Sequence, residues 1–251
     1  MAESGLDIRG LNVSLGGRTI VEDASLAVSA GSLGVVCGPN GAGKSTLLRA
    51  ALGLLPHLGK VTAGGRELSS FVPVERARLI SYVPQRSLLD SGVAVCDVVR
   101  QGRYAHGESR RWSQRHVVKA LERCGISELA LRSFRQLSGG ERRMVLVARA
   151  LCTGAPVMLL DEPTAWLDIK KRLALLELLR QLAADGLCIL CVLHDLDDAA
   201  RYGDSVFLMN QGKVVATGSA ETVLSPSQVR DVYGVDAVLG GATAYRLPGA
   251  T

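Results

Sequence analysis

Short apolar runs separated by amphipathic segments predict an α/β fold. The runs over 33–37, 157–160 and 189–193 are almost entirely apolar, which is typical of parallel strands buried on both faces. Apolar positions recur at helical spacing over 45–55 and over 169–184. The core-facing positions predicted for the second helix are Leu173, Leu176, Leu179 and Leu182. The pattern indicates an open, mostly parallel sheet with helices between its strands.

The two outer parts of the chain follow a different pattern. Residues up to about 32 alternate apolar and polar positions around Gly16 and Gly17, which predicts antiparallel strands beside the parallel core. The segment 210–213, Asn-Gln-Gly-Lys, separates two apolar runs and predicts a hairpin turn. The antiparallel part therefore flanks the parallel sheet in the predicted fold.

We expect one domain with an inserted lobe. The chain has 251 residues and a mass of 26.5 kDa, which is enough to bury a sizeable core. Residues 1–85 and 157–225 are predicted to form the core with its antiparallel lobe, and 86–156 a mostly helical lobe. Residues 226–251 are predicted to be a tail, of which 240–251 form either an accessory strand or a loose end.

A glycine-rich loop joins the first buried run to the helical pattern after it. Glycines permit a tight turn in which successive N–H groups and the positive end of the helix converge on phosphate oxygens. Lys44 adds a charge at the β- and γ-phosphates, and the Ser45 hydroxyl suits Mg²⁺. A nucleoside triphosphate is therefore the predicted ligand. The residues predicted to bind it are Gly38, Pro39, Asn40, Gly41, Ala42, Gly43, Lys44, Ser45 and Thr46.

A second motif, Leu-Ser-Gly-Gly-Glu over 137–141, precedes another helical pattern. Ser138 is suited to cap that helix, which leaves glycine N–H groups free for an anion. With both motifs, the sequence resembles the nucleotide-binding subunits of ABC transporters over nearly its whole length. The resemblance implies a P-loop NTPase (RecA-like) fold, with a mostly parallel core, an antiparallel β subdomain and an inserted helical subdomain. It also implies an ATPase that uses ATP and Mg²⁺.

Two carboxylates follow the second buried run. Asp161 and Glu162 stand at the carboxyl end of a predicted strand, where open α/β sheets place their chemistry. By the resemblance, Asp161 matches the aspartate that holds Mg²⁺ through water, and Glu162 the carboxylate that polarises the attacking water. Mg²⁺ is thus assigned to Ser45, Gln85 and Asp161.

Three further assignments depend mostly on the resemblance. His194 follows the third buried run and matches the family's switch histidine. Gln85 matches the glutamine that senses Mg²⁺ and the membrane partner, and Asp168 matches the aspartate of the D-loop. The predicted catalytic set is therefore Glu162, His194, Gln85 and Lys44, and Asp168 joins the nucleotide-binding set.

The resemblance also implies partners. The phosphate loop of each chain is expected to face Ser138, Gly139 and Gly140 of a second copy, with two ATP molecules between them in a closed head-to-tail homodimer. A multi-spanning permease is the expected membrane partner, and a substrate-binding protein acts indirectly through it. We expect no nucleic-acid partner.

Bulk properties agree with a peripheral protein. No apolar stretch approaches the length of about 18 residues that a membrane helix needs, and the amino terminus lacks a signal-peptide pattern. We expect the chain to lie at the cytoplasmic face of the inner membrane, where the permease would bind it. The net charge is +5, and the arginines at 100, 103, 110, 111 and 115 are predicted to form a solvated face rather than a nucleic-acid patch. Cys188 and Cys191, three apart in a strand, should lie on opposite faces as reduced core residues.

Cargo is the least determined property. The segments 102–106, 167–169 and 232–235 resemble the importers of iron–siderophore complexes, haem and vitamin B12. We predict an iron–siderophore importer, with haem or vitamin B12 as alternatives. A soluble ABC ATPase of DNA repair or translation is the alternative from another class, but it usually carries a long coiled-coil insertion or tandem cassettes. A P-loop kinase or GTPase would lack the motif at 137–141.

One position departs from the family. An aromatic side chain near the amino terminus stacks on adenine in relatives, and Leu15 stands at the matching position. No Phe, Tyr or Trp occurs before Phe71, and Arg18 is the nearby residue that could cover the base. Since stacking contributes about 1–3 kcal/mol per base in nucleic-acid complexes, we predict weakened base selectivity and tolerance of GTP.

Overall fold

A six-stranded sheet organises the computed structural model of the chain, which describes residues 4–86, 92–238 and 244–246. Its strand order is β10-β9-β3-β8-β7-β6, and only the β9–β10 hairpin is antiparallel. The strands are β3 Leu33–Cys37, β6 Ile80–Val83, β7 Val157–Asp161, β8 Cys188–Val192, β9 Ser205–Asn210 and β10 Lys213–Gly218. The parallel core and the hairpin turn after Asn210 confirm the sequence prediction.

A second, antiparallel sheet packs beside this core with the order β2-β1-β4-β5. Its strands are β1 Ser4–Leu15, β2 Arg18–Ser29, β4 Leu58–Ala63 and β5 Arg66–Glu67. Burial alternates along the later part of β2, because one face of a half-buried strand meets the core. At the carboxyl end, β11 Asp236–Val238 pairs with β12 Ala244–Arg246, while 239–243 and 247–251 lie outside the described residues.

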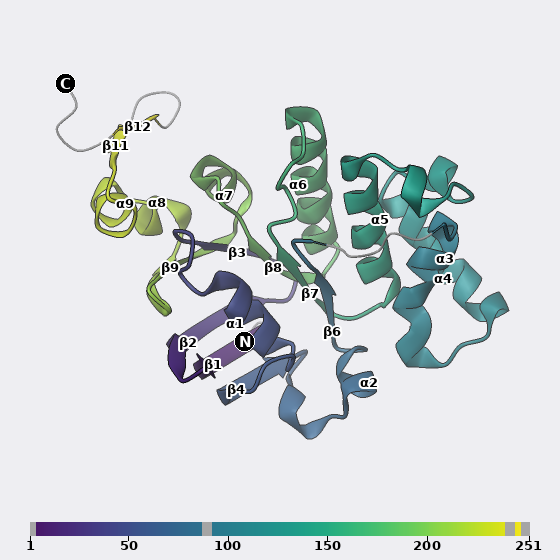
Figure 1. Cartoon of the computed structure of the whole chain (residues 1–251), viewed down its shortest axis with the longest axis horizontal. Coiled ribbons are helices and arrows are strands. Elements are labelled where there is room, and N and C mark those ends of the chain that lie inside the picture. The colour runs from purple at the N-terminus through teal and green to yellow at the C-terminus, as the bar shows by residue number, and fades with distance from the viewer. Residues whose placement is uncertain (1–3, 87–91, 239–243, 247–251) are drawn as a thin grey trace.

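Helices cover the large sheet on both faces. In Figure 1, α5, α6 and α7 lie on one face, and α1 with the antiparallel strands lies on the other. The α-helices are α1 Lys44–Ala51, α2 Pro73–Arg76, α3 Val95–Arg100, α4 Arg110–Arg123, α5 Gly139–Cys152, α6 Ile169–Ala184, α7 Leu196–Tyr202, α8 Ala220–Val223 and α9 Pro226–Tyr233. The helix predicted over 45–55 ends early, since the chain turns at Gly53 with a positive φ.

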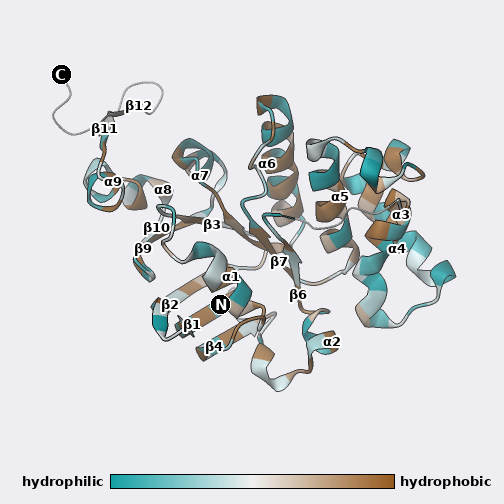
Figure 2. Cartoon of the chain, in the orientation of Figure 1, coloured by the Kyte–Doolittle hydropathy of each residue, from teal (hydrophilic) through white to brown (hydrophobic). Residues whose placement is uncertain are grey.

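Two apolar clusters form the core, one on each face of the large sheet (Figure 2). Cys188 belongs to the cluster beneath α1 and Cys191 to the cluster beneath α6, and both thiols are free, which confirms the prediction of opposite faces. The predicted core position Leu173 is wrong: its side chain is 37% exposed. It lies in the first half of α6, before Leu175 begins the run of leucines that contacts the sheet.

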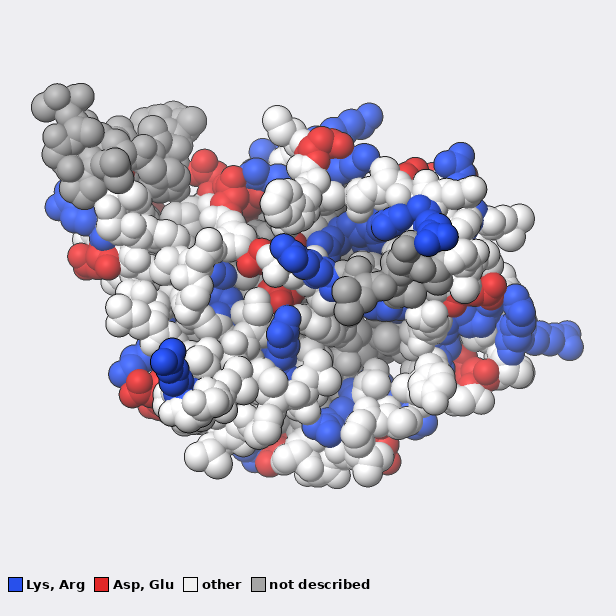
Figure 3. All heavy atoms as spheres, viewed as in Figure 1, with Lys and Arg blue, Asp and Glu red and all other residues white. Residues whose placement is uncertain are grey.

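The arginine-rich segment of the helical lobe is only partly solvated. Arg103 is 7% exposed, which corrects the prediction of a solvated face at this position. Its guanidinium pairs with Glu108 and donates to the carbonyl oxygen of Thr153 at 2.8 Å. Its pairing and hydrogen bonds offset the cost of burying the charge. Figure 3 shows Lys and Arg side chains dispersed over the visible face, with Asp and Glu among them. Over the described residues, every helix falls short of the length and apolar character needed to cross a bilayer.

Candidate functional site

The phosphate loop connects β3 to α1 in a conformation that depends on glycine. A Cβ on Gly38 would lie 2.2 Å from the carbonyl oxygen of Met209, and Gly43 caps α1 with a φ of 97°. The ammonium group of Lys44 donates to the carbonyl oxygens of Gly38 at 2.7 Å and Pro39 at 2.9 Å. The side chain of Lys44 therefore lies across the loop, and burial lowers its pKa.

Two of the three proposed magnesium donors, Ser45 and Asp161, meet at the end of β7, whereas the amide of the third, Gln85, bonds Glu162. Asp161 is fully buried, and one of its carboxylate oxygens accepts a hydrogen bond from the Ser45 hydroxyl at 2.9 Å. Burial raises the pKa of Asp161, while the hydrogen bond from Ser45 lowers it. A hydroxyl and a carboxylate are hard oxygen donors, and Mg²⁺ binds through one or two such groups while it keeps several waters. These residues fit Mg²⁺, and they would hold it together with the phosphates of a nucleotide.

Glu162 is the carboxylate next along the chain, and it lies between two polar partners. Its φ of 47° is unusual for a residue other than glycine, and such strain concentrates at functional sites. One carboxylate oxygen is 2.6 Å from Nε2 of His194, and the other accepts a hydrogen bond from the Gln85 amide. A depression of about 440 Å³ opens beside Glu162 and His194. The structure thus brings these three predicted residues together.

The other predicted residues lie apart from this cluster. Ser138 caps α5, where its backbone N–H donates to Glu141 at 2.7 Å and its hydroxyl accepts from the Glu141 N–H at 3.4 Å. Gly140 packs against the side chain of Lys171. Asp168 caps α6 and accepts from the Lys171 N–H at 2.9 Å. Among the described residues, their hydrogen bonds stay within these two helix ends.

Comparison with known proteins decides the family. The model of the ABC transporter family matches residues 21–165. The chain belongs to the ABC transporter family. The family match confirms the prediction that the chain is an ABC-type ATPase.

Several relatives cover most of this ABC transporter chain. The protein named "Cobalamin import ATP-binding protein BtuD" from Halobacterium salinarum is 39% identical over 256 residues, which span 98% of the chain but only 64% of that relative's length. "Hemin import ATP-binding protein HmuV" of Pseudomonas putida is 39% identical over 240 residues, covering 93% of the chain and 94% of that protein. HmuV of Hahella chejuensis is 41% identical over 230 residues, 87% of the chain and 88% of that protein.

Solved structures confirm the P-loop NTPase fold. The ADP conformation of an ATP-binding cassette of an ABC transporter superposes with a TM-score of 0.82 at 26% identity, covering 92% of this chain and 98% of that one. A putative metal-chelate type ABC transporter, in an inward-facing conformation, has a TM-score of 0.81 at 24% identity over 97% and 96% of the two chains. At this identity the second likeness shows the fold alone.

Sequence reasoning missed three polar side chains of the ABC transporter site. Arg143 in α5 donates to the carbonyl oxygens of Pro84 and Gln85, both at 2.7 Å. It thereby connects α5, which begins in the Leu-Ser-Gly-Gly-Glu motif of 137–141 (the signature), to the segment that contains Gln85. Arg172 lies 2.6 Å from a carboxylate oxygen of Asp195, the residue after His194. The third is Tyr82, which bonds Asp161. Arg143 is the fourth residue after Gly139 in α5, where helical periodicity indicates a buried side chain. Nothing in the sequence marks the other two residues.

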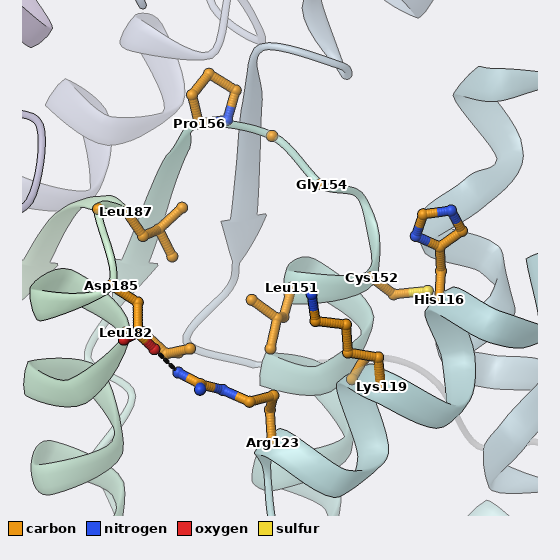
Figure 4. A pocket seen from close by; sticks show the side chains of 13 residues that line it. His116, Lys119, Arg123, Leu151, Cys152, Gly154, Pro156, Leu182, Asp185 and Leu187 are labelled. Atoms are coloured by element: carbon orange, nitrogen blue, oxygen red, sulfur yellow. Dashed lines mark hydrogen bonds and ion pairs between the residues drawn. The ribbon is translucent and has the colours of Figure 1, made fainter.

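Two hollows of this ABC transporter chain lie away from the phosphate loop. A cavity of about 590 Å³ separates α4 from the ends of α5 and α6, with His116, Lys119 and Arg123 on its α4 side (Figure 4). The ion pair between Arg123 and Asp185 crosses it and links the helical lobe to the core. A second hollow of about 460 Å³ is lined by Tyr82, Tyr104, Arg149 and Thr153 and is called the Tyr104 groove below.

Proposed function

We propose that the chain is the ATP-hydrolysing subunit that energises an ABC importer. The observation that carries this proposal is the contact of two carboxylates at the end of β7 with the phosphate loop and with His194. Asp161 bonds Ser45 at 2.9 Å, and Glu162 lies 2.6 Å from His194. Phosphoryl transfer depends mainly on positioning and charge stabilisation, and these groups surround the place where a γ-phosphate would end.

Each residue then has a defined task. Lys44 and the N–H groups of the loop bind the phosphates, and Ser45 and Asp161 orient the hydrated cation, which when bound neutralises phosphate charge. Glu162 orients the attacking water and accepts its proton. His194 and Gln85 hold the two oxygens of Glu162, and so fix the direction of that carboxylate.

A second copy of the chain would complete the site. Gly139 and Gly140 begin α5, where helix geometry leaves their N–H groups without an intrahelical acceptor, yet they and Ser138 lie on a different helix from the phosphate loop. Trp166 adjoins both a small pocket beside Gly139 and the depression beside Glu162, and it is 89% exposed with a φ of 66°. A large exposed aromatic side chain on a constrained backbone is typical of an interface anchor. These features support a head-to-tail homodimer with ATP between the chains.

The Tyr104 groove is the surface that we assign to the membrane permease. Tyr104 is 86% exposed on the 3-10 turn Gln101–His106, and the buried Arg103 fixes that turn to the end of α5. Arg149 lines the groove, burial lowers its pKa, and the described residues show no ion pair for it. A cytoplasmic permease segment with apolar residues and one carboxylate fits this groove. We expect Tyr104→Ala to abolish transport while ATP binding by the isolated chain persists.

The relatives support import of a metal chelate, and the specific cargo is our prediction. HmuV proteins are named for hemin and BtuD for cobalamin. An iron–siderophore complex is the cargo that we predict, with haem and vitamin B12 as alternatives, and a substrate-binding protein would deliver it to the permease. The names of the relatives favour no siderophore in particular.

Uptake by cells tests this function. We would replace the chromosomal gene by a Glu162→Gln version and measure uptake of a labelled ferric siderophore, haem and cobalamin. Glu177→Gln, an exposed glutamate of α6, is the matched control. If Glu162→Gln cells lose uptake of one of the three compounds and Glu177→Gln cells retain it, that compound is the cargo. Retention of all three uptakes would contradict the importer proposal.

A further inference from the structure

Tyr82 connects the Tyr104 groove to the buried carboxylate of Asp161. It lies in β6, paired with Leu159 of the neighbouring β7, so its side chain reaches toward the carboxyl end of that strand. Its hydroxyl donates to Oδ2 of Asp161 at 3.2 Å, and its ring forms part of the groove wall. Within the described part of the chain, it is the groove-lining residue whose hydrogen bond reaches Asp161.

The two oxygens of Asp161 have different anchors. Oδ1 accepts from Ser45 at 2.9 Å and Oδ2 from Tyr82 at 3.2 Å. The terminal torsion of an aspartate has a broad energy minimum, so a single hydrogen bond leaves the plane of the carboxylate free to turn. The second hydrogen bond restricts that rotation. Because Ser45 is itself a predicted cation ligand, Tyr82 is the anchor that stays in place when Ser45 turns toward the cation.

The hydroxyl of Tyr82 is the donor in its hydrogen bond with Asp161. An ordinary phenol keeps its proton near neutral pH, so the hydroxyl can donate to the Asp161 carboxylate. The guanidinium of Arg49 in α1 lies near the same hydroxyl. The phenol therefore lies between a guanidinium and a carboxylate, and its proton points at Asp161.

We propose that Tyr82 is a positioning residue for the magnesium site, because its hydroxyl holds the Asp161 carboxylate in the orientation that receives the hydrated cation of the nucleotide. This inference depends on the proposed function, since it requires the chain to bind ATP with Mg²⁺. The ring of Tyr82 also faces the Tyr104 groove, so a permease segment docked there contacts the residue that orients Asp161.

Metal-dependent nucleotide binding tests the proposal. We would measure the affinity of the isolated chain for a fluorescent ATP analogue in EDTA and with Mg²⁺, and compare Tyr82→Phe with Tyr104→Phe. Both variants remove one phenol hydroxyl from the same groove, but only Tyr82 bonds Asp161. We expect Tyr82→Phe to reduce the gain in affinity that Mg²⁺ provides by about tenfold, because a hydrogen bond to a charged group is lost. Affinity in EDTA should stay unchanged, and Tyr104→Phe should match the wild type in both conditions.

A double-mutant cycle with Asp161→Asn separates positioning from general damage. If the hydroxyl acts through Asp161, then Tyr82→Phe should have no further effect on the magnesium gain in the Asp161→Asn background. An unchanged magnesium gain in Tyr82→Phe, or an equal loss of affinity with and without Mg²⁺, would overturn the proposal. A wild-type chain that binds no nucleotide in either condition would instead contradict the proposed function.

Discussion

The phosphate-loop region and the signature region differ in how their polar groups are satisfied. Around the loop, Lys44 bonds carbonyl oxygens of the loop itself, while Asp161 and Glu162 bond residues from other elements of the same chain. Around the signature, Ser138 and Asp168 bond only the first turn of their own helices among the described residues. The carboxylates of the first region are held by other elements, whereas Ser138 and Gly139 at the start of α5 are exposed. The difference agrees with the proposed head-to-tail dimer, in which each chain would contribute two unlike half-sites, its phosphate loop and its signature residues.

The exposed aromatic residue points to the same conclusion. Trp166 is 89% exposed and adjoins both the Glu162 depression and a small pocket of about 180 Å³ beside Gly139. A monomer gains nothing from an exposed tryptophan, whereas an interface can bury most of its surface. Both regions would therefore be covered when two chains meet head to tail.

The largest expected effect is at Glu162. Glu162→Gln removes the base in the phosphate-loop region, and loss of a general base costs about 10²- to 10⁴-fold in rate. ATP should still bind, because the loop and Asp161 are unchanged. Single-turnover hydrolysis and nucleotide binding measured on the same preparation would check this. Hydrolysis at the wild-type rate would remove Glu162 from its role.

Lys44→Ala should have the next largest effect. The substitution removes the charge that bonds the loop and faces the β- and γ-phosphates, so ATP affinity should fall by about 10- to 100-fold. Lys119→Ala, which removes an exposed lysine of α4 away from the phosphate loop, is the matched control. Isothermal titration with ATP measures both variants, and normal affinity for Lys44→Ala would contradict the assignment of the loop.

Trp166 allows the signature region to be examined directly. The chain has two tryptophans, so Trp112→Phe leaves Trp166 as a single reporter. In a Glu162→Gln background we expect ATP, and not ADP, to shift its emission to the blue as the ring is buried. Trp166→Ala should weaken dimer formation by about tenfold. An unchanged emission together with a dimer of normal strength would show that Trp166 lies outside the interface.

The base-selectivity prediction concerns the antiparallel sheet beside the loop. Leu15 ends β1 and is paired with Arg18 across the turn, where it is partly exposed and available to a base. Leu15→Tyr should raise ATP affinity by roughly 5- to 10-fold and increase the preference for ATP over GTP, since an aromatic ring stacks on the base. Equilibrium binding of the two nucleotides measures this, and an unchanged affinity and ratio would refute it.

The smallest expected effect is at the contact between the lobe and the core. Arg123 and Asp185 form a largely exposed ion pair, and such pairs contribute about 0.2–1 kcal/mol. Arg123→Ala should therefore lower the melting temperature by only about 1–4 °C. Thermal denaturation at low and high salt checks this, and a drop of tens of degrees would show that the contact has a larger structural role.

Local sequence signals predicted most of the fold because each depends on neighbouring residues. The helix at Ile169–Ala184 and the strand at Leu33–Cys37 match their predicted ranges, since apolar periodicity and strand burial are local properties. Leu173 was wrong because periodicity gives a helix face but not its limits. Arg103 was wrong because its buried partner, the Thr153 carbonyl, lies fifty residues away in the sequence.

The site residues also differ in whether local sequence motifs could predict them. Motifs located Ser45, Asp161, Glu162 and His194, and the structure places them together. Tyr82 could not be predicted, because its contact with Asp161 arises from the pairing of β6 with β7, and that register is a tertiary property. The roles of Ser138 and Asp168 toward a nucleotide stay predictions, since they require a second chain.

Sedimentation of the Glu162→Gln chain tests the two-half-site account most directly. With ATP and Mg²⁺ the account predicts a species of twice the 26.5 kDa chain mass, and Ser138→Arg in the same background should restore the monomer. A Glu162→Gln chain that retains ATP as a monomer, or a Ser138→Arg chain that hydrolyses ATP at the wild-type rate, would contradict it.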